Sequence, residues 1–227
     1  MKTSMNAVFH YVSTAEAAFI AGLSDRHMNR VVDEHILPDV LFHGEDGRSF
    51  ARLGAAFASF YFATEDMFAA QFRRKVLRDL TTRLEARPDK DHFFSLTSLP
   101  WDADWHVDAP YVTCVDIVEF VEAALERTKQ IEQAHALVTI DPEVMGGQAV
   151  FSGSRLPIEN ILSSLVQGIE FSRIQTTYPF LTDMHIQAAK VFSRIHPKRG
   201  RPMKLSEANP HWKVRSSRIV HPVSEPQ

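Results

Sequence analysis

The sequence predicts a mainly α fold with small β elements (α+β), and three local patterns support this prediction. Apolar residues recur at helical spacing in several segments, of which 65–86 is the longest. Extended runs are short and flank turns rich in Gly and Asp, as in residues 40–50. Two separate stretches each predict short helices joined by a tight turn, which is the layout of a helix-turn-helix unit.

The first helix-turn-helix unit is marked by its caps. Ser13 and Glu16 form a capping box, because the Ser side chain can accept from the N–H three residues on while the Glu reaches back. Gly22 ends this helix, since glycine tolerates the left-handed conformation needed beyond a C-terminus. Ser24 then caps a second helix over 25–35, which a proline ends.

The segments that follow complete a predicted winged helix-turn-helix and helical region over residues 1–87. A hairpin over 40–50 would be the wing. Helices are expected over 51–63 and 65–86, and the second is predicted to expose a row of arginines, Arg73, Arg74, Arg78 and Arg83. Residues 88–135 are expected to connect this region to the next, with strands over 93–99 and 105–113 and a helix over 115–134.

Residues 136–195 form a second predicted domain. Short extended pieces at 137–140 and 149–151 surround Gly146-Gly147, which suits a hairpin turn, and Gly153 suits a second tight turn. Three short helices follow, over 158–167, 170–177 and 182–195, with Thr182 as an N-cap. Arg155 precedes the first of them, where we expect a structural salt bridge, with phosphate contact as the alternative. The domain is therefore predicted to be helix-turn-helix-like.

One motif in this domain has long and fixed spacing: Asp141-Pro142, Gly146-Gly147 and Gly153-Ser154-Arg155-Leu156-Pro157. Over about residues 138–195 the chain resembles the family catalogued as domain of unknown function 433. Members are regarded as VapB-type antitoxins encoded beside PIN-like ribonuclease toxins. The whole arrangement, with an N-terminal helix-turn-helix and a basic tail, resembles the longer mycobacterial-type VapB proteins. The resemblance implies an antitoxin that neutralises a nuclease and represses its own operon.

Composition excludes some classes of protein. A hydrophobic share of 44% with 16 Phe is enough for packed cores. No apolar run reaches the roughly 18–20 residues of a membrane span, and the first residues lack a signal-peptide layout. The single cysteine, Cys114, precludes an internal disulfide. We therefore expect a cytoplasmic protein without a membrane partner.

Four residues on the second predicted helix are candidates for DNA contact: Arg26, His27, Asn29 and Arg30. Arg and Asn can contact base edges bidentately in the major groove, and all four can hold phosphate. A protein–protein module with a polar helix is the alternative. In the second unit, the last helix begins with Asp183, which disfavours close phosphate approach, so dimerisation or toxin contact is at least as plausible there.

The last segment, 196–227, is predicted to be a flexible basic tail, because it holds seven Lys or Arg and two Asp or Glu. Arg199-Gly200-Arg201-Pro202 resembles the core of an AT-hook, whose arginines enter a narrow A·T minor groove. Alternatively this arm enters the acidic site of a ribonuclease toxin, or is a spacer. Residues that would bind the toxin lie downstream: Lys204, Trp212, Arg215 and Arg218.

No catalytic motif outweighs a structural explanation. Asp102, Asp104 and Asp108 with His106 form an acidic cluster that a metal nuclease could use, but they fall in a predicted turn region. Phosphate-loop, nucleophile-elbow and zinc-helix motifs are lacking, and the sequence near Cys114 shows no evident base that would activate it as a nucleophile. We expect neither catalysis nor a cofactor or metal.

The sequence thus predicts a type II antitoxin that binds a cognate PIN-like ribonuclease toxin and its operator DNA. A homodimer or a larger toxin–antitoxin complex is expected, because two copies would read paired half-sites. A stand-alone transcription regulator and a metal-dependent nuclease remain the alternatives.

Overall fold

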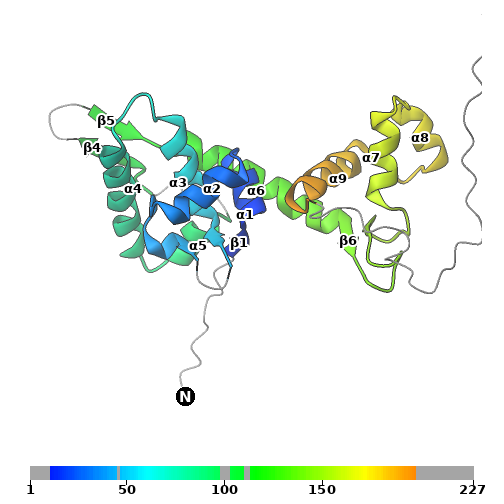
Figure 1. Cartoon of the computed structure of the whole chain (residues 1–227), viewed down its shortest axis with the longest axis horizontal. Helices are drawn as coiled ribbons and strands as arrows, with labels where there is room; N and C mark the ends of the chain where they lie inside the picture. Colours follow the sequence, from blue (N-terminus) through cyan, green and yellow to red (C-terminus); the bar gives the residue numbers. More distant parts are fainter. Residues whose placement is uncertain (1–10, 45–46, 98–102, 110–112, 198–227) are drawn as a thin grey trace, which may run out of the picture. The chain divides into compact units, whose positions relative to one another are not determined.

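The computed structural model describes residues 11–44, 47–97, 103–109 and 113–197. It is mainly helical with small antiparallel sheets, as the sequence predicts (Figure 1). Its helices pack around two hydrophobic clusters, and α6 contributes to both. No described helix combines the length and apolar character of a membrane crossing.

The first elements form a winged helix-turn-helix arrangement. Strand β1 (Tyr11–Ser13) leads into α1 (Thr14–Ala21), and a turn connects α1 to α2 (Asp25–Asp33). The 3-10 helix η1 (Asp39–Leu41) precedes β2 (Phe42–His43), which pairs antiparallel with β3 (Ser49–Ala51). Strand β1, which the sequence did not predict, pairs with the other side of β3, so the sheet order is β1-β3-β2.

The local signals that define this arrangement are confirmed. Ser13 and Glu16 make both hydrogen bonds of the capping box. Gly22 has φ +68, which an L side chain rarely adopts, and its N–H bonds back to α1. The Ser24 hydroxyl accepts from the N–H of His27 and so caps α2.

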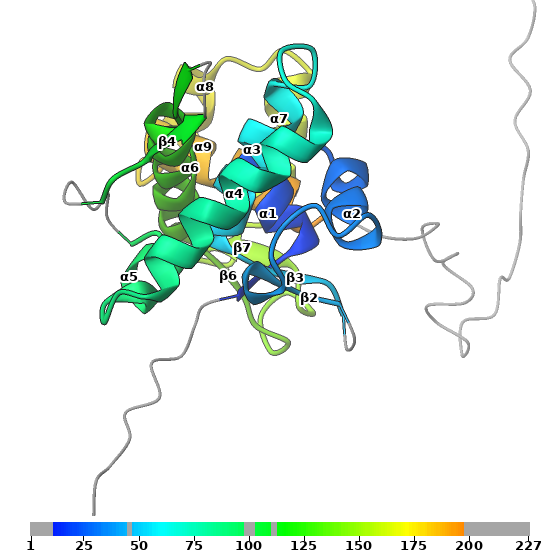
Figure 2. The same cartoon turned by 90° about the vertical axis from the view of Figure 1, so that its left-hand side faces the viewer.

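Four helices contribute most of the other residues of the first cluster. They are α3 (Arg52–Ala63), α4 (Ala70–Glu85), α5 (Lys90–Ser95) and the long α6 (Val118–Leu137). Helix α3 is buried along most of its length and packs against α1, α4, α5 and α6. In Figure 2, α4 crosses in front of α3. Gly54 on α3 allows a close approach, because a Cβ there would lie 2.9 Å from the backbone oxygen of Leu41.

Two predictions for residues 88–135 are wrong. The strand expected over 93–99 is instead helix α5, in which the adjacent residues Phe93 and Phe94 are both buried; a half-buried strand would alternate them. The strand expected over 105–113 is two strands, β4 (His106–Ala109) and β5 (Thr113–Asp116), paired antiparallel. The sequence between them contains Pro110, which cannot donate to a strand ladder. The helix expected from residue 115 begins at Val118.

The second cluster belongs to the segment after α6. Strands β6 (Val138–Ile140) and β7 (Ala149–Phe151) form the predicted hairpin. Gly146 and Gly147 have φ +66 and +78. A Cβ would meet nothing within 4 Å at Gly146 and only an ordinary 3.7 Å contact with Pro142 at Gly147, so backbone conformation explains both glycines. Three helices follow: α7 (Ile158–Val166), α8 (Phe171–Thr177) and α9 (Asp183–Ile195). Helix α9 packs extensively on α6 and also contacts α1 and α7.

Candidate nucleic-acid interface

Helix α2 holds the four residues predicted to contact DNA, and their surroundings differ. Arg26 is exposed near the N-terminus of α2 and takes part in no hydrogen bond or ion pair with another described residue. His27 is half-buried, because its ring lies 4.7 Å from that of Phe62 and its Nδ1 is 2.9 Å from the Ser24 hydroxyl. Of the two residues in the first turn, Arg26 is therefore the one whose whole side chain could contact DNA.

Asn29 and Arg30 are engaged within the chain. The Asn29 Oδ1 accepts from Arg48 at 2.8 Å, and Arg48 also pairs with Asp33 at 2.6 Å. Arg48 immediately precedes β3, so this pair of contacts ties the hairpin to α2. Arg30 pairs with Glu34 at 2.8 Å and lies over Phe62.

The Arg30–Glu34 pair is exposed on both sides, with about two-fifths of each side chain accessible. The hydrogen bond to Arg30 holds the pKa of Glu34 below its ordinary value, and the same bond raises the pKa of Arg30. An exposed pair of this kind contributes little to stability, so a phosphate group could replace Glu34 as the partner of Arg30 at little cost.

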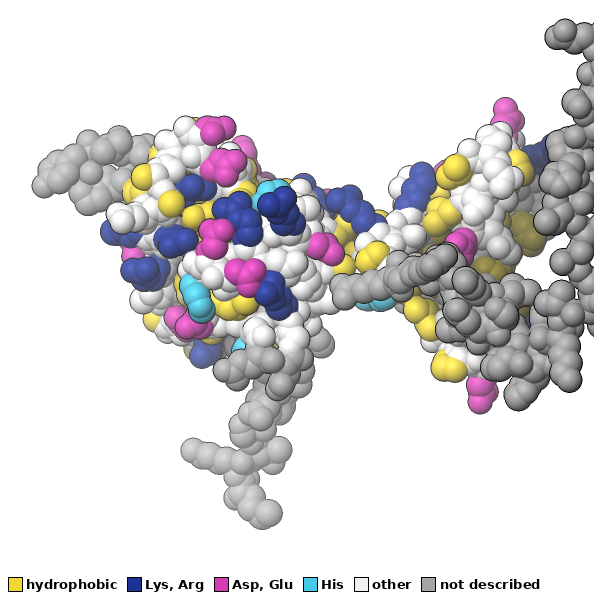
Figure 3. Space-filling model, viewed as in Figure 1, with side chains coloured by type: hydrophobic (Ala, Val, Ile, Leu, Met, Phe, Trp, Pro, Cys, Tyr) yellow, Lys and Arg dark blue, Asp and Glu magenta, His cyan; other side chains and the backbone are white. Residues whose placement is uncertain are grey.

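Helix α4 adds basic residues beside α2. Arg74 donates to the backbone oxygen of Glu34 at 3.3 Å, which places α4 against the C-terminus of α2. Lys75 and Arg78 are exposed on α4, and Lys75 is paired with Asp79. Figure 3 shows Lys and Arg side chains on the visible surface of this part of the molecule, with acidic side chains among them.

The predicted row of arginines on α4 is only partly correct. Arg73 is buried, donates to the backbone oxygen of Tyr61 and lies 4.2 Å from the centre of that ring. Its guanidinium therefore connects α4 to α3. Arg78 and Arg83 are exposed as expected.

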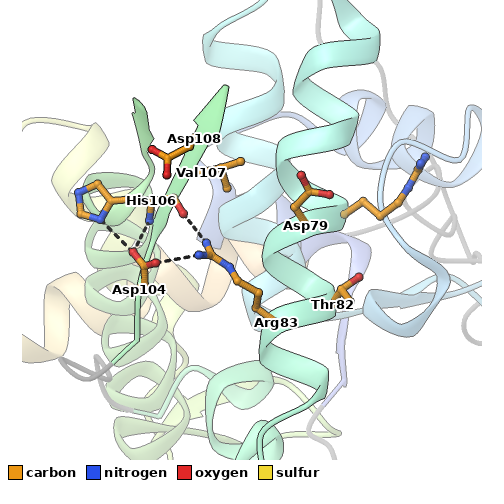
Figure 4. A pocket seen from close by; sticks show the side chains of 8 residues that line it. Asp79, Thr82, Arg83, Asp104, His106, Val107 and Asp108 are labelled. Carbon is orange, nitrogen blue, oxygen red and sulfur yellow. Dashed lines mark hydrogen bonds and ion pairs between the residues drawn. The ribbon is translucent and has the colours of Figure 1, made fainter. Parts of the chain in front are cut away.

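A shallow hollow of about 410 Å³ opens between α4 and β4, lined by Arg78, Asp79, Thr82, Arg83, Asp104, His106, Val107 and Asp108. Figure 4 shows Arg83 reaching from α4 to the carboxylate of Asp104 and the backbone oxygen of His106. Hydrogen bonds from the His106 backbone and ring lower the pKa of Asp104. The hollow thus contains the predicted acidic cluster, except Asp102, which lies outside the described residues.

Asp104 and His106 in this hollow form ion pairs with other side chains of the chain. Asp104 is 2.8 Å from Arg83, and His106 is 3.5 Å from Asp116. Among the described residues, no group of three or more His, Cys, Asp or Glu is arranged to hold a metal ion. Desolvation and the neighbouring Asp108 raise the pKa of Cys114, which disfavours the thiolate form needed by a nucleophile.

The second helix-turn-helix-like unit presents a different surface. Asp183 and Met184 are exposed at the start of α9, and Thr182 is its N-cap, with the Thr182 N–H 3.3 Å from His185 Nδ1. The other end of α9 packs on α1, where Arg194 lies over Phe19. The first turn of α9 therefore presents one acidic and one apolar residue.

Arg155 does not form the expected salt bridge. Its side chain is exposed, and it has no ion pair with another described residue. The glycines of the same motif have positive φ, as expected for residues in tight turns. The tail residues Arg199, Gly200, Arg201, Lys204, Trp212, Arg215 and Arg218 lie outside the described residues.

Two residues that the sequence did not identify as part of the site contact α2 from distant positions in the chain. Arg48, just before β3, and Phe62, on α3, contact α2 at separations of 15 to 35 residues along the chain. The position of Arg48 in the predicted wing could have marked it as a candidate, but no neighbouring residue in the sequence identifies Asn29 and Asp33 as its partners. Phe62 lies in a run of apolar residues and has no distinguishing signal.

The described residues thus hold a winged helix-turn-helix arrangement before α3, and a hairpin and three helices after α6. A family model described as "Protein of unknown function (DUF433)" matches residues 138–193. The "Uncharacterized protein y4eO" of Sinorhizobium fredii (strain NBRC 101917 / NGR234) is 31% identical over 206 residues, covering 88% of each chain. No solved structure matches the chain significantly. The chain therefore belongs to the family of this rhizobial protein and carries a DUF433 domain.

Proposed function

We propose that the chain is the antitoxin of a toxin–antitoxin pair, which binds its operator DNA and a PIN-like ribonuclease toxin. The observation that carries the DNA-binding part is the strand–helix–helix–hairpin arrangement of residues 11–51, with sheet order β1-β3-β2. In such an arrangement the second helix enters the major groove and the hairpin lies beside it. The antitoxin part rests on the resemblance of the DUF433 domain to VapB-type proteins.

Helix α2 is better suited to DNA than α9. The N-terminal residues of a recognition helix contact base edges. Both helices begin with an exposed aspartate, Asp25 on α2 and Asp183 on α9, but the next residue is the exposed Arg26 on α2 and the exposed Met184 on α9. Of these two helices, α2 is the one with a cation beside its first aspartate, where that cation can contact phosphate. We therefore assign DNA contact to α2, with Arg26 at the bases or phosphates and Arg30 at a phosphate after release from Glu34.

The proposed function requires binding and no chemistry. The engagement of Asp104 by Arg83 and His106 supports this proposal, because a catalytic carboxylate would have to exchange these partners for a metal ion. The residues proposed to bind the toxin remain those of the tail, Lys204, Trp212, Arg215 and Arg218.

The DNA assignment is tested by comparing two exposed arginines without ion pairs, Arg26 on α2 and Arg173 on α8. The probe is a duplex spanning the promoter of the chain's own operon. Arg26→Ala should weaken binding by roughly 5- to 100-fold and reduce the salt slope by about one. Arg173→Ala should leave both unchanged. The reverse pattern would transfer DNA contact to the DUF433 domain.

The tail is tested separately with Arg199→Ala combined with Arg201→Ala. If the tail contacts DNA, affinity and salt dependence both fall. If only binding of the toxin falls, the arm serves the toxin.

The antitoxin assignment is tested by co-expression with the adjacent gene. The expected result is a co-purifying complex and rescue of growth when that gene alone is toxic. DNA binding without a co-purifying nuclease would identify a stand-alone regulator. Magnesium-dependent cleavage of nucleic acid that Asp104→Ala abolishes would contradict the proposal.

A further inference from the structure

Asn29 lies three residues after Arg26 on α2, and one end of its amide is engaged within the chain. Its Oδ1 accepts a 2.8 Å hydrogen bond from Nη1 of Arg48. Its Nδ2 donates to no other described residue, yet it is not among the buried polar side-chain atoms that lack a partner. Solvent therefore reaches the Nδ2 of Asn29, and this nitrogen can donate to another molecule.

The chemistry of Arg48 decides which end of this amide faces it. A guanidinium carries five N–H donors and no acceptor, whereas an amide has an acceptor oxygen and a donor NH₂. If the amide of Asn29 were turned over, its NH₂ would face the N–H groups of Arg48, and two donors would meet. Arg48 therefore holds the amide in one of its two orientations, with the NH₂ directed away from the guanidinium.

Arg48 is itself held from several directions. Its Nη1 also donates to the backbone oxygen of Asn29 at 3.3 Å, and its Nη2 lies 2.6 Å from a carboxylate oxygen of Asp33. The hydroxyl of Thr14, at the start of α1, donates to the backbone oxygen of Arg48 at 3.4 Å. The Arg48 side chain is 34% exposed, so the protein covers most of it. These contacts fix the position of the guanidinium beside α2.

We propose that Asn29 contacts DNA as a hydrogen-bond donor through Nδ2, and that Arg48 is the positioning residue that fixes it in this role, an assignment that rests on the proposed DNA contact of α2. Asn29 and Arg26 are three residues apart, so they lie on the same side of α2 near its N-terminus. There a recognition helix meets base edges. The major-groove acceptors available to an amide NH₂ are N7 and O6 of guanine, N7 of adenine and O4 of thymine, whereas cytosine presents a donor.

Arg48 is assigned to positioning and not to a phosphate because its guanidinium is already engaged. Among the described residues it donates four hydrogen bonds to Asn29 and Asp33. The more exposed Arg30 donates two, both to the carboxylate of Glu34. A phosphate could therefore recruit Arg30 more easily than Arg48. An asparagine amide without such a partner could turn over, whereas the contact with Arg48 makes Asn29 a fixed donor.

The first test measures the dissociation constant for a duplex spanning the promoter of the chain's own operon. Asn29→Ala should weaken binding by roughly three- to tenfold, which corresponds to the loss of one hydrogen bond. Asn29→Asp should bind no more tightly than Asn29→Ala, because a carboxylate can keep the contact with Arg48 but cannot donate. Asn160→Ala is the matched control and should leave the constant unchanged, since Asn160 is exposed on α7 and its side chain bonds to no other described residue.

A double-mutant cycle tests whether Arg48 acts through Asn29. Arg48→Met is combined with Asp33→Asn, so that no carboxylate is left without its partner beside the DNA. With Asn29 present, this combination should weaken binding by roughly three- to tenfold, but in the Asn29→Ala background by less than about twofold. The salt slope should stay the same in both backgrounds, because no phosphate contact is lost.

Arg48→Lys provides the conservative variant. A lysine also donates and cannot accept, so it should keep the amide orientation and bind DNA more tightly than the combination with Arg48→Met. Circular dichroism and thermal midpoints show whether each variant folds. The Asn29 variants test the donor role even if the Arg48→Met combination does not fold.

The proposal would be overturned by tighter binding of Asn29→Asp than of Asn29→Ala, or by an equal loss from the Arg48 change in both backgrounds. A salt slope that falls by about one on changing Arg48 would also overturn it, because Arg48 would then contact a phosphate itself. If Arg26→Ala weakens binding and Asn29→Ala does not, only the role of Asn29 is wrong. If neither variant weakens binding, the assignment of DNA contact to α2 fails as well.

Discussion

The part of the chain built on the first hydrophobic cluster and the DUF433 domain built on the second differ in what they leave exposed. Seven large hydrophobic residues are exposed among the described residues, and six of them lie in the DUF433 domain: Ile140, Met145, Val166, Ile169, Phe180 and Met184. Only Met67 lies in the first part. Because exposed apolar side chains concentrate where proteins bind one another, the DUF433 domain is the part suited to protein partners.

The two parts also differ in how many of their arginines bond to other residues of the chain. In the first part, Arg48, Arg52 and Arg83 each bond to a carboxylate, and Arg73 and Arg127 each bond to a backbone oxygen. In the DUF433 domain, Arg155 and Arg173 have no such partner among the described residues. The first part thus satisfies most of its own side chains and presents a preorganised α2, while the second leaves both apolar and charged groups for contacts with other molecules.

Core substitutions test whether the two parts unfold together. Phe57 in the first cluster and Phe151 in the second are both fully buried. Alanine at either position should lower the free energy of unfolding by about 3–5 kcal/mol, measured by urea denaturation. If the parts are one cooperative unit, both variants shift a single transition. Two transitions, each affected by one variant, would separate them.

Phe180→Ala provides the control for this pair. Phe180 is 43% exposed, so its loss should cost much less than either buried phenylalanine. An equal cost would mean that a contact outside the described residues covers Phe180.

Glycine substitutions should destabilise the two parts for different reasons. Gly54→Ala places a Cβ 2.9 Å from the backbone oxygen of Leu41, so α3 or η1 must shift, at a cost of about 1–3 kcal/mol. Gly147→Ala has room for its methyl but must keep φ near +78, which costs about 1–2 kcal/mol. Denaturant midpoints measure both.

Asparagine separates the two explanations, because it tolerates positive φ better than alanine does. Gly147→Asn should therefore recover part of the loss, whereas Gly54→Asn should be worse than alanine. Recovery at position 54 would contradict the steric explanation.

His135 should give the smallest effect, a pH dependence where α1, α6 and α9 meet. Desolvation lowers the pKa of His135, partly opposed by Glu16 at 3.9 Å, and the nearby His196 and Arg52 lower it further. The folded state therefore binds the proton less well than the unfolded state, so stability is present above the ordinary histidine pKa and falls as pH drops below about 6.5. The thermal midpoint should fall between pH 7.5 and 5.5.

His135→Gln should reduce this fall, whereas His35→Gln, on a side chain that is 76% exposed, should not. An identical pH dependence in wild type and His135→Gln would assign the acid sensitivity to other groups.

Much of the local structure and part of the candidate site could be predicted from sequence. The capping box of Ser13 and Glu16, the left-handed Gly22 and the turn at Gly146-Gly147 depend on atoms a few residues apart, so neighbouring residues determine them. The same is true of α2, whose caps and polar face identified Arg26. The winged arrangement followed from these elements in order, although β1 did not, because three residues are too few for a periodic signal.

Contacts between distant segments decided the rest. Two adjacent buried phenylalanines made α5 a helix where a strand was expected, and burial against Tyr61 removed Arg73 from the predicted surface. Arg48 engaged Asn29 across 19 residues, and Arg155 was left without the salt bridge expected of it. Sequence by itself determined the capped starts of α1 and α2 and the glycine turns, because capping and backbone conformation are local. Only tertiary packing decided which charged and apolar side chains stay exposed for a partner, because burial depends on residues far apart in the chain.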